Sequence, residues 1–221
     1  MPEIMITGSA GRLEGRYKHS KIAGAPIALI LHPNPQRGGT MNNKIAYSLF
    51  QTFAEKGFST LRFNFRGVGR SQGEFSHGEG ELSDAASALD WLQSINPNAS
   101  GVWVGGFSFG AWIGMQLLMR RPEIRGYVSI SPPANIYDFN FLAPCPNEGL
   151  IIQGDTDQVV NIESVNKLVE KLRIQRGVNG VEYHVIKGAG HFFNNDGESE
   201  KLISHVGTYL NRLLTARKAA A

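Results

Sequence analysis

Residues 102–112 join a short apolar strand to the start of a helix through a Gly-x-Ser-x-Gly turn. Gly106 and Gly110 flank Ser108 and leave room for neighbouring backbone where the chain reverses direction. Such a turn exposes the serine hydroxyl to a base and a substrate, and the helix after it directs its positive end towards the same place. A serine hydroxyl is a poor nucleophile until a base takes its proton, so the turn predicts a nucleophile with a partner elsewhere in the chain.

The same motif occurs a second time, at residues 69–73, and the flanking sequence distinguishes the two copies. Ser71 is followed by a polar, glycine-rich loop that cannot begin a helix at the serine. Ser108 is followed by an apolar segment of strong helix formers, which begins at Ala111. We therefore predict that Ser108 is the nucleophile and that Ser71 is a loop residue at the end of a strand.

Apolar strand-like runs alternate with amphipathic segments of helix length along the chain. The expected strands are 26–32, 59–65, 102–107, 127–130, 149–153 and 181–186, with two edge strands at 4–6 and 13–17. The expected helices are 40–56, 81–95, a helix from the Ser108 turn to about Pro122, 162–174 and 199–214. This alternation predicts a single α/β domain over residues 1–221, with a mostly parallel, twisted sheet and helices on both faces.

Composition narrows the classes of function. The net charge is only +3 and no basic cluster is interleaved with aromatic residues, which argues against nucleic acid as a partner. No segment resembles a signal peptide or is apolar for long enough to cross a bilayer, so we expect a cytoplasmic protein without membrane attachment. Cys145 is the only cysteine, and no His, Cys or carboxylate cluster has the spacing of a metal site, so we expect no disulfide, metal or cofactor.

A base for Ser108 should lie in a loop after a strand, because the reactive groups of such a sheet gather at the carboxyl ends of its strands. His191 is the best placed of the six histidines, since it follows the strand 181–186 through a loop that contains two glycines. Asp155 and Asp157 both follow the strand 149–153. We expect one of these carboxylates to orient His191 and the other to brace the turn.

An oxyanion hole needs two backbone N–H groups. Phe109, the residue after the nucleophile, is expected to supply one of them. The other should come from the loop after the strand 26–32, which begins with the sequence PNPQ. Proline has no N–H to donate, so Asn34 is the expected second donor and Gln36 is the alternative.

Over nearly its whole length the chain resembles the α/β-hydrolase superfamily, and in particular small bacterial hydrolases related to dienelactone hydrolase. The resemblance rests on residues 32–35 (HPNP), 38–43 (GGTMNN), 64–71 (NFRGVGRS), 106–110 (GFSFG), 154–157 (GDTD) and 188–193 (GAGHFF). The chain order Ser, Asp, His is also that of the superfamily. The resemblance places the acid three residues after Gly154 and so implies a triad of Ser108, Asp157 and His191. Dienelactone hydrolase itself uses a cysteine nucleophile, which makes dienelactone an unexpected substrate here.

Other side chains belong to loops at the expected reactive edge of the sheet. We expect His32, Arg66 and Phe192 to contact the substrate, and Arg37 and Arg70 are further candidates for binding a substrate carboxylate or phosphate. Arg66 has a second possible role, which the sequence favours over substrate binding: it could brace its own loop by hydrogen-bonding to carbonyl groups. The segment 132–147, where related enzymes carry a lid, is short, which predicts a minimal lid and small or flexible acyl groups.

The sequence therefore predicts a metal-independent serine hydrolase that cleaves a small-molecule carboxylic ester through an acyl-enzyme. Thioesterase, acyltransferase and aminopeptidase-like activities use the same machinery and are the alternatives among enzymes. A non-catalytic binding or scaffold protein on the same fold is the alternative from another class.

Overall fold

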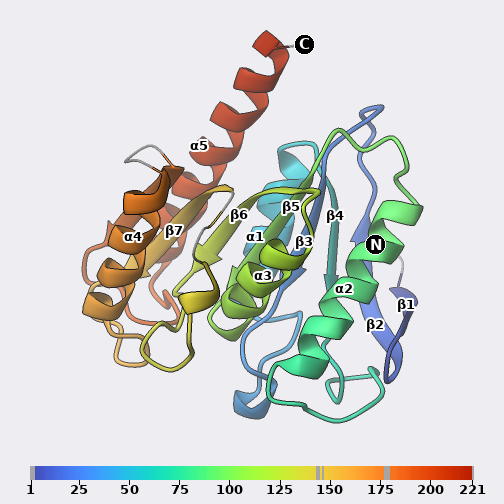
Figure 1. The fold of residues 1–221 in the computed structure, drawn as a ribbon, viewed down its shortest axis with the longest axis horizontal. Coiled ribbons are helices and arrows are strands. Elements are labelled where there is room, and N and C mark those ends of the chain that lie inside the picture. Colours follow the sequence, from blue (N-terminus) through green and yellow to red (C-terminus); the bar gives the residue numbers. More distant parts are fainter. Residues whose placement is uncertain (1–2, 143–144, 146, 177–179, 221) are drawn as a thin grey trace.

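The computed structural model of the chain describes residues 3–142, 145, 147–176 and 180–220. Within these residues the strands form one eight-stranded sheet in the order β1-β2-β4-β3-β5-β6-β7-β8 (Figure 1). β2 pairs antiparallel with β1 and with β4, and all other neighbouring strands pair in parallel, which confirms the expected mostly parallel sheet. The strands are β1 (Glu3–Gly8), β2 (Gly11–Lys18), β3 (Ile27–Leu31), β4 (Ser59–Phe63), β5 (Val102–Phe107), β6 (Ile124–Ile130), β7 (Glu148–Gly154) and β8 (Val181–Ile186).

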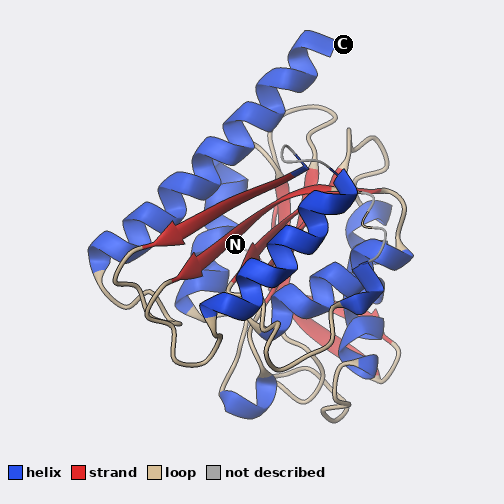
Figure 2. Ribbon diagram, turned by 60° about the vertical axis from the view of Figure 1, so that its left-hand side comes forward, coloured by secondary structure: helices blue, strands red, loops and turns tan. Residues whose placement is uncertain are grey.

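Helices cover both faces of the sheet (Figure 2). One face packs on α1 (Lys44–Glu55) and α5 (Asp196–Ala220), and the other on α2 (Glu79–Ser94), α3 (Phe109–Arg120) and α4 (Ile162–Arg176). Alternate residues of β3 divide between the two cores, since Ala28 and Ile30 join α1 and α5 whereas Leu29 joins the other three helices. β3 is therefore buried on both sides, and this explains its continuous apolar sequence.

The observed helices begin within a few residues of those expected, and side-chain caps explain the shifts. α1 begins at Lys44 rather than at residue 40, because Asn43 Oδ1 accepts the amides of Ile45 (3.0 Å) and Ala46 (3.4 Å). α2 begins two residues before the expected start, where its own Glu81 accepts the Gly78 amide at 2.7 Å. Residues 143, 144 and 146 of the expected lid segment, and residues 1, 2, 177–179 and 221 of the expected domain, lie outside the described residues.

Ser108 lies at the sharp turn between β5 and α3 with φ 53° and ψ −120°, in the left-handed region that is costly for a residue with a side chain. Two backbone contacts enforce this turn. A Cβ on Gly106 would lie 2.4 Å from the Gly110 carbonyl oxygen, and a Cβ on Gly110 would lie 2.3 Å from the Leu31 carbonyl oxygen. Both glycines are therefore required for the first turn of α3 to pack on β5 and on the end of β3.

His32 joins the ends of β3 and β4 from inside the protein. Its Nδ1 donates to the Pro33 carbonyl oxygen at 2.7 Å, and its Nε2 accepts the Phe65 amide at 3.0 Å. The ring is 1 % exposed, and burial lowers the pKa of His32 to about 4 despite the opposing effect of the hydrogen bond to Pro33. Both ring nitrogens are used by backbone, so the structure corrects the prediction that His32 contacts the substrate.

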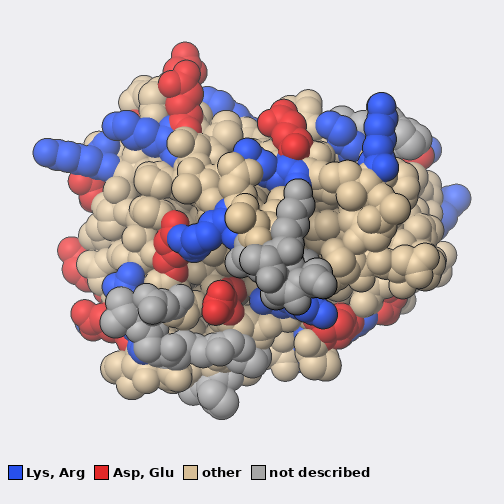
Figure 3. All heavy atoms as spheres, turned by 90° about the horizontal axis from the view of Figure 1, so that it is seen from above, with Lys and Arg blue, Asp and Glu red and all other residues tan. Residues whose placement is uncertain are grey.

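The outer surface carries charges of both signs. On the face shown in Figure 3, Lys and Arg side chains are interspersed with Asp and Glu, and neither sign dominates. Within the described part of the chain, none of the helices combines the length and the apolar character needed to cross a membrane.

Replacing Gly106 by Ala should destabilise the fold, because the added methyl group overlaps backbone atoms of the Ser108 turn rather than a flexible side chain. We expect a loss of about 1–3 kcal/mol in the free energy of unfolding, measured by urea denaturation followed by circular dichroism. Gly197→Ala is the matched control, because a Cβ there meets nothing within 4 Å and the residue lies in α5. Equal stability of the two variants would contradict this account of the turn.

The buried neutral His32 should make stability depend on pH between about 6.5 and 4. In this window the unfolded chain binds a proton on His32 and the folded chain does not, so the free energy of unfolding falls as the pH falls, by up to about 3 kcal/mol. His32→Gln keeps a donor and an acceptor but does not titrate. Urea denaturation at a series of pH values should show a shallower loss for the variant than for the wild type, and parallel curves would disprove the assignment.

Candidate active site

The tertiary structure brings Ser108, His191 and Asp157 into one hydrogen-bonded chain. Ser108 follows β5, Asp157 follows β7, and His191 follows β8, so all three lie at the carboxyl edge of the sheet. His191 Nε2 is 3.2 Å from Ser108 Oγ, and His191 Nδ1 is 2.7 Å from Asp157 Oδ2. Each of the three residues exposes less than a tenth of its surface. The arrangement is that of a nucleophile, a base and an acid that orients the base.

The surroundings of Asp157 keep its carboxylate charged. Oδ1 accepts the amides of Val159 and Val160, each at 2.8 Å, while Oδ2 accepts from Gln153 Nε2 at 3.0 Å as well as from His191. Burial acts to raise the pKa of Asp157, but the hydrogen bonds from His191 and from the backbone outweigh it and hold that pKa below its usual value. Because an ionised carboxylate can only accept, His191 carries its proton on Nδ1, and Nε2 is left to accept from Ser108.

Asp155 occupies a different position from Asp157, although only two residues separate them. Its Oδ1 accepts the Gly188 amide at 2.6 Å and so ties the turn after β7 to the loop after β8. Thr156 reinforces the same connection, because its Oγ1 donates to the Gly188 carbonyl oxygen at 3.1 Å. Of the two candidate carboxylates, Asp157 reaches His191 and Asp155 braces the turn.

Two backbone amides near Ser108 are available to a bound group. Phe109 is the first residue of α3, and the first amides of a helix have no carbonyl partner within it. The Ser108 carbonyl oxygen is bonded by the later amides of Ala111 and Trp112. Among the described residues, neither the Phe109 amide nor the Asn34 amide donates to another protein atom. The Gln36 amide is already bonded to Asn34 Oδ1 at 2.7 Å, which leaves Asn34 as the better placed of the two candidates from this loop.

A pocket of about 140 Å³ opens at Ser108 and His191. Its polar wall comes from the loop after β3 and comprises Asn34, Arg37, Gly38, Gly39 and Asn43. Its apolar wall comes from the loops after β6, β7 and β8 and comprises Pro133, Ile136, Val159 and Phe192. Pro33, Phe109 and Tyr137 complete the lining. Phe192 is 49 % exposed and lines the pocket, and its contact with a substrate stays a prediction.

Arg66 and Ser71 have structural environments away from this pocket. Arg66 donates from Nε and Nη2 to the two oxygens of the buried Asp84, at 3.0 and 2.8 Å, and its backbone amide bonds to Asp84 as well. This pair fastens the loop after β4 to α2, so the structure corrects the prediction that Arg66 contacts the substrate. Ser71 Oγ donates to the Asn64 carbonyl oxygen at 2.6 Å and accepts the Glu14 amide at 2.9 Å, so both of these hydrogen bonds join it to backbone rather than to a histidine.

The sequence interpretation missed two residues that support the site. Gln153 lies fully buried at the end of β7 and donates to Asp157 and to the Val160 carbonyl oxygen. A polar side chain inside an apolar strand requires hydrogen-bond partners, and this was a usable signal. Tyr137 stacks on Trp112 at 4.3 Å between ring centroids, and its hydroxyl accepts from Asn34 Nδ2 at 3.2 Å. Its role depends on contacts between distant segments, for which the sequence carries no local signal.

Two family models match overlapping parts of the chain. The model of the X-Pro dipeptidyl-peptidase family (S15) matches residues 21–143, and that of the prolyl oligopeptidase family matches residues 125–217. The first match contains Ser108 and the second contains Asp157 and His191.

Two curated relatives match this chain over different shares of their length. An uncharacterized protein of Rickettsia prowazekii is 50% identical over 95% of this chain and 89% of its own length. Lysophosphatidylserine lipase ABHD12 of Bos taurus is 26% identical over 56% of this chain, but this match covers only 30% of that relative.

Solved structures extend the likeness to the whole fold. A protein of unknown function from Agrobacterium tumefaciens, provisionally assigned to the alpha/beta hydrolases, is 60% identical, with a TM-score of 0.93 over 97% of both chains. An alpha-beta serine hydrolase homologue from Coxiella burnetii is 34% identical, with a TM-score of 0.83 over 95% of this chain and 97% of that one. A serine hydrolase without a lid from Xanthomonas campestris is 28% identical, with a TM-score of 0.85 over 96% and 94%. The chain belongs to the α/β-hydrolase superfamily and is a serine hydrolase of that fold.

Proposed function

We propose that the protein is a carboxylic ester hydrolase in which Ser108, His191 and Asp157 form the catalytic triad. The observation that carries the proposal is the continuous hydrogen-bonded chain from Ser108 Oγ through both nitrogens of His191 to Asp157, at the mouth of a pocket. Such a chain supplies a base to activate the serine and a charge to stabilise the imidazolium that forms.

The proposed reaction proceeds in two halves. Ser108 Oγ attacks the ester carbonyl carbon while His191 Nε2 takes the hydroxyl proton, and the Phe109 and Asn34 amides bind the oxyanion. His191 then gives its proton to the departing alcohol oxygen, which leaves an acyl group on Ser108. Water attacks this acyl-enzyme with His191 again as base, and the carboxylic acid leaves as Ser108 regains its proton.

A peptidase is the second candidate, since both matching family models describe peptidases. An enzyme that binds the free amino end of a peptide needs an anionic or strongly accepting group for the ammonium ion. Among the described residues that line the pocket there is no Asp or Glu, and the charged side chain of its polar wall is that of Arg37. This charge favours an ester over a peptide amino terminus as the substrate.

The small volume of the pocket supports a short acyl group. The segment after β6 is held against α3, because Tyr137 stacks on Trp112 and Trp112 Nε1 donates to the Asp138 carbonyl oxygen at 3.0 Å. It therefore forms a wall of the pocket rather than a separate lid. Thioesters of similar size fit the same machinery and belong in any substrate panel.

Ser108→Ala should abolish ester hydrolysis, because no other described hydroxyl lies within reach of His191. We expect kcat/KM for p-nitrophenyl butyrate to fall more than about a thousandfold. A fluorophosphonate probe should label the wild type but not the variant, whereas a scaffold protein stays unlabelled. Ser71→Ala is the control for the second copy of the motif: it should lower stability by about 1 kcal/mol and leave turnover unchanged. Retained activity in Ser108→Ala would overturn the triad.

The acyl preference can be measured with p-nitrophenyl acetate, butyrate, octanoate and palmitate. We expect kcat/KM to be highest for the short esters, since the pocket beside Ser108 holds only about 140 Å³. A dipeptidyl p-nitroanilide with proline at the scissile bond, assayed in parallel, should be a poor substrate. Preference for palmitate would refute the small-acyl proposal, and faster cleavage of the anilide than of the esters would favour the peptidase.

A further inference from the structure

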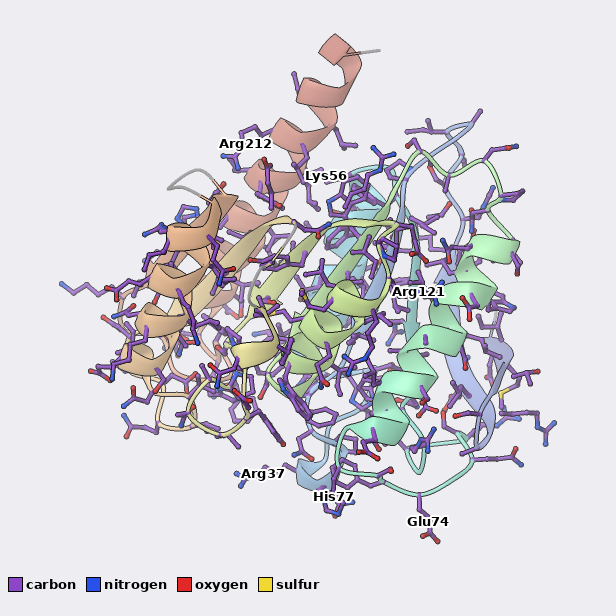
Figure 4. All side chains as sticks on the ribbon, viewed as in Figure 1. Arg37, Lys56, Glu74, His77, Arg121 and Arg212 are labelled. Atoms are coloured by element: carbon purple, nitrogen blue, oxygen red, sulfur yellow. The ribbon has the colours of Figure 1, made fainter. Side chains whose placement is uncertain are left out.

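Three arginines lie in the loops that follow β3 and β4, and two of them are paired within the protein. Arg66 forms its ion pair with Asp84 at 2.8 Å, and Arg70 pairs with Glu3. Among the described residues, the Arg37 guanidinium has neither an ion pair nor a hydrogen bond. Figure 4 shows Arg37 at the end of η1 (Pro35–Arg37), at the end of the molecule where the parallel strands finish. Arg37 is therefore the arginine that is free to meet a ligand.

The charge of Arg37 is not balanced by an acid at the pocket. Of the described residues that line it, none is Asp or Glu. Glu81 acts electrostatically on Tyr137, and its oxygens accept the Ser76 and Gly78 amides at 2.9 and 2.7 Å. Glu81 is completely buried and bonded to these amides, and it forms no ion pair with Arg37.

Tyr137 offers a second donor beside this charge. Its oxygen accepts a hydrogen bond from Asn34 Nδ2, so its own O–H proton is left for another acceptor. Arg37 and Tyr137 both line the pocket, and the charge of Arg37 acts on the Tyr137 hydroxyl. A guanidinium and a hydroxyl from residues that line one pocket are suitable donors for an anionic group.

The pocket thus has two chemically different sides around the reacting serine. The apolar wall, which includes Ile136 and Phe192, suits a hydrocarbon part of the substrate. The polar wall, which includes Arg37, suits a negatively charged part. Building on the proposed ester hydrolase activity, we infer that the substrate is an ester that also carries an anionic group, a carboxylate or a phosphate, and that Arg37 binds this group.

Pairs of esters that differ only in charge test the inference. One pair is 4-acetoxybenzoate and 4-acetoxybenzamide, which place the charge on the alcohol side. The other is mono-p-nitrophenyl adipate and the p-nitrophenyl ester of adipamic acid, which place it on the acyl side. We expect the anionic member of at least one pair to be hydrolysed with the higher kcat/KM, mainly through a lower KM. 4-Acetoxyphenyl phosphate, compared with 4-acetoxybenzamide, tests phosphate as the anion.

Arg37→Gln should reduce the preference for the anionic member by about tenfold, as expected for loss of a charge-assisted hydrogen bond. Arg125→Gln is the matched control, since it removes the same charge from the exposed start of β6 at the opposite end of the sheet. An Arg37-dependent preference for the carboxylate or for the phosphate supports the inference. Absence of any preference in the wild type, or a preference that Arg37→Gln retains, overturns it.

The neutral esters and the fluorophosphonate probe separate this failure from failure of the proposed function. If the neutral members are hydrolysed through Ser108 but charge makes no difference, only the role of Arg37 is wrong. If Ser108 is not labelled and none of the esters is cleaved, the proposed hydrolase activity itself is wrong.

Discussion

The close contact between the first turn of α3 and the end of β3 governs the geometry of the whole site. The Gly110 backbone packs on the Leu31 carbonyl oxygen, and this contact holds Ser108 in a left-handed conformation that a free chain would avoid. It also brings the loop after β3 beside the nucleophile. Asn34 and Phe109, far apart in the sequence, consequently line the same pocket.

Buried hydrogen bonds around this contact keep the surrounding loops in place. His32, the residue after Leu31, links β3 to the chain beyond β4 through the Phe65 amide. The Arg66–Asp84 pair then fastens that chain to α2. Removing one member of such a buried pair would leave its partner buried and unpaired. These polar groups therefore act as structural connections and are unavailable to a substrate.

Pairing with carboxylates also distinguishes three arginines that are similar in sequence. Each follows a strand at the reactive edge, and the sequence does not show which of them is paired with a carboxylate. Asp84 and Glu3 neutralise two of them, whereas Arg37 keeps an unbalanced charge at the pocket. The difference between the two paired arginines and the unpaired Arg37 is the presence of a carboxylate brought from a distant segment.

The sequence by itself determined the alternation of strands and helices, the single sheet, and the choice of Ser108 and His191. These follow from local patterns: apolar periodicity and a turn that requires glycine at 106 and 110. Residue spacing left Asp155 and Asp157 open and the family resemblance implied Asp157, which the tertiary structure brings to His191. Only the tertiary structure decided that His32 and Arg66 are internal, and that Gln153 and Tyr137 support the site. Each of these outcomes depends on how closely segments remote in the sequence approach each other, or on how deeply they bury a side chain. Residue type and spacing along the chain do not specify such distances, because they arise only when the strands are assembled into a sheet.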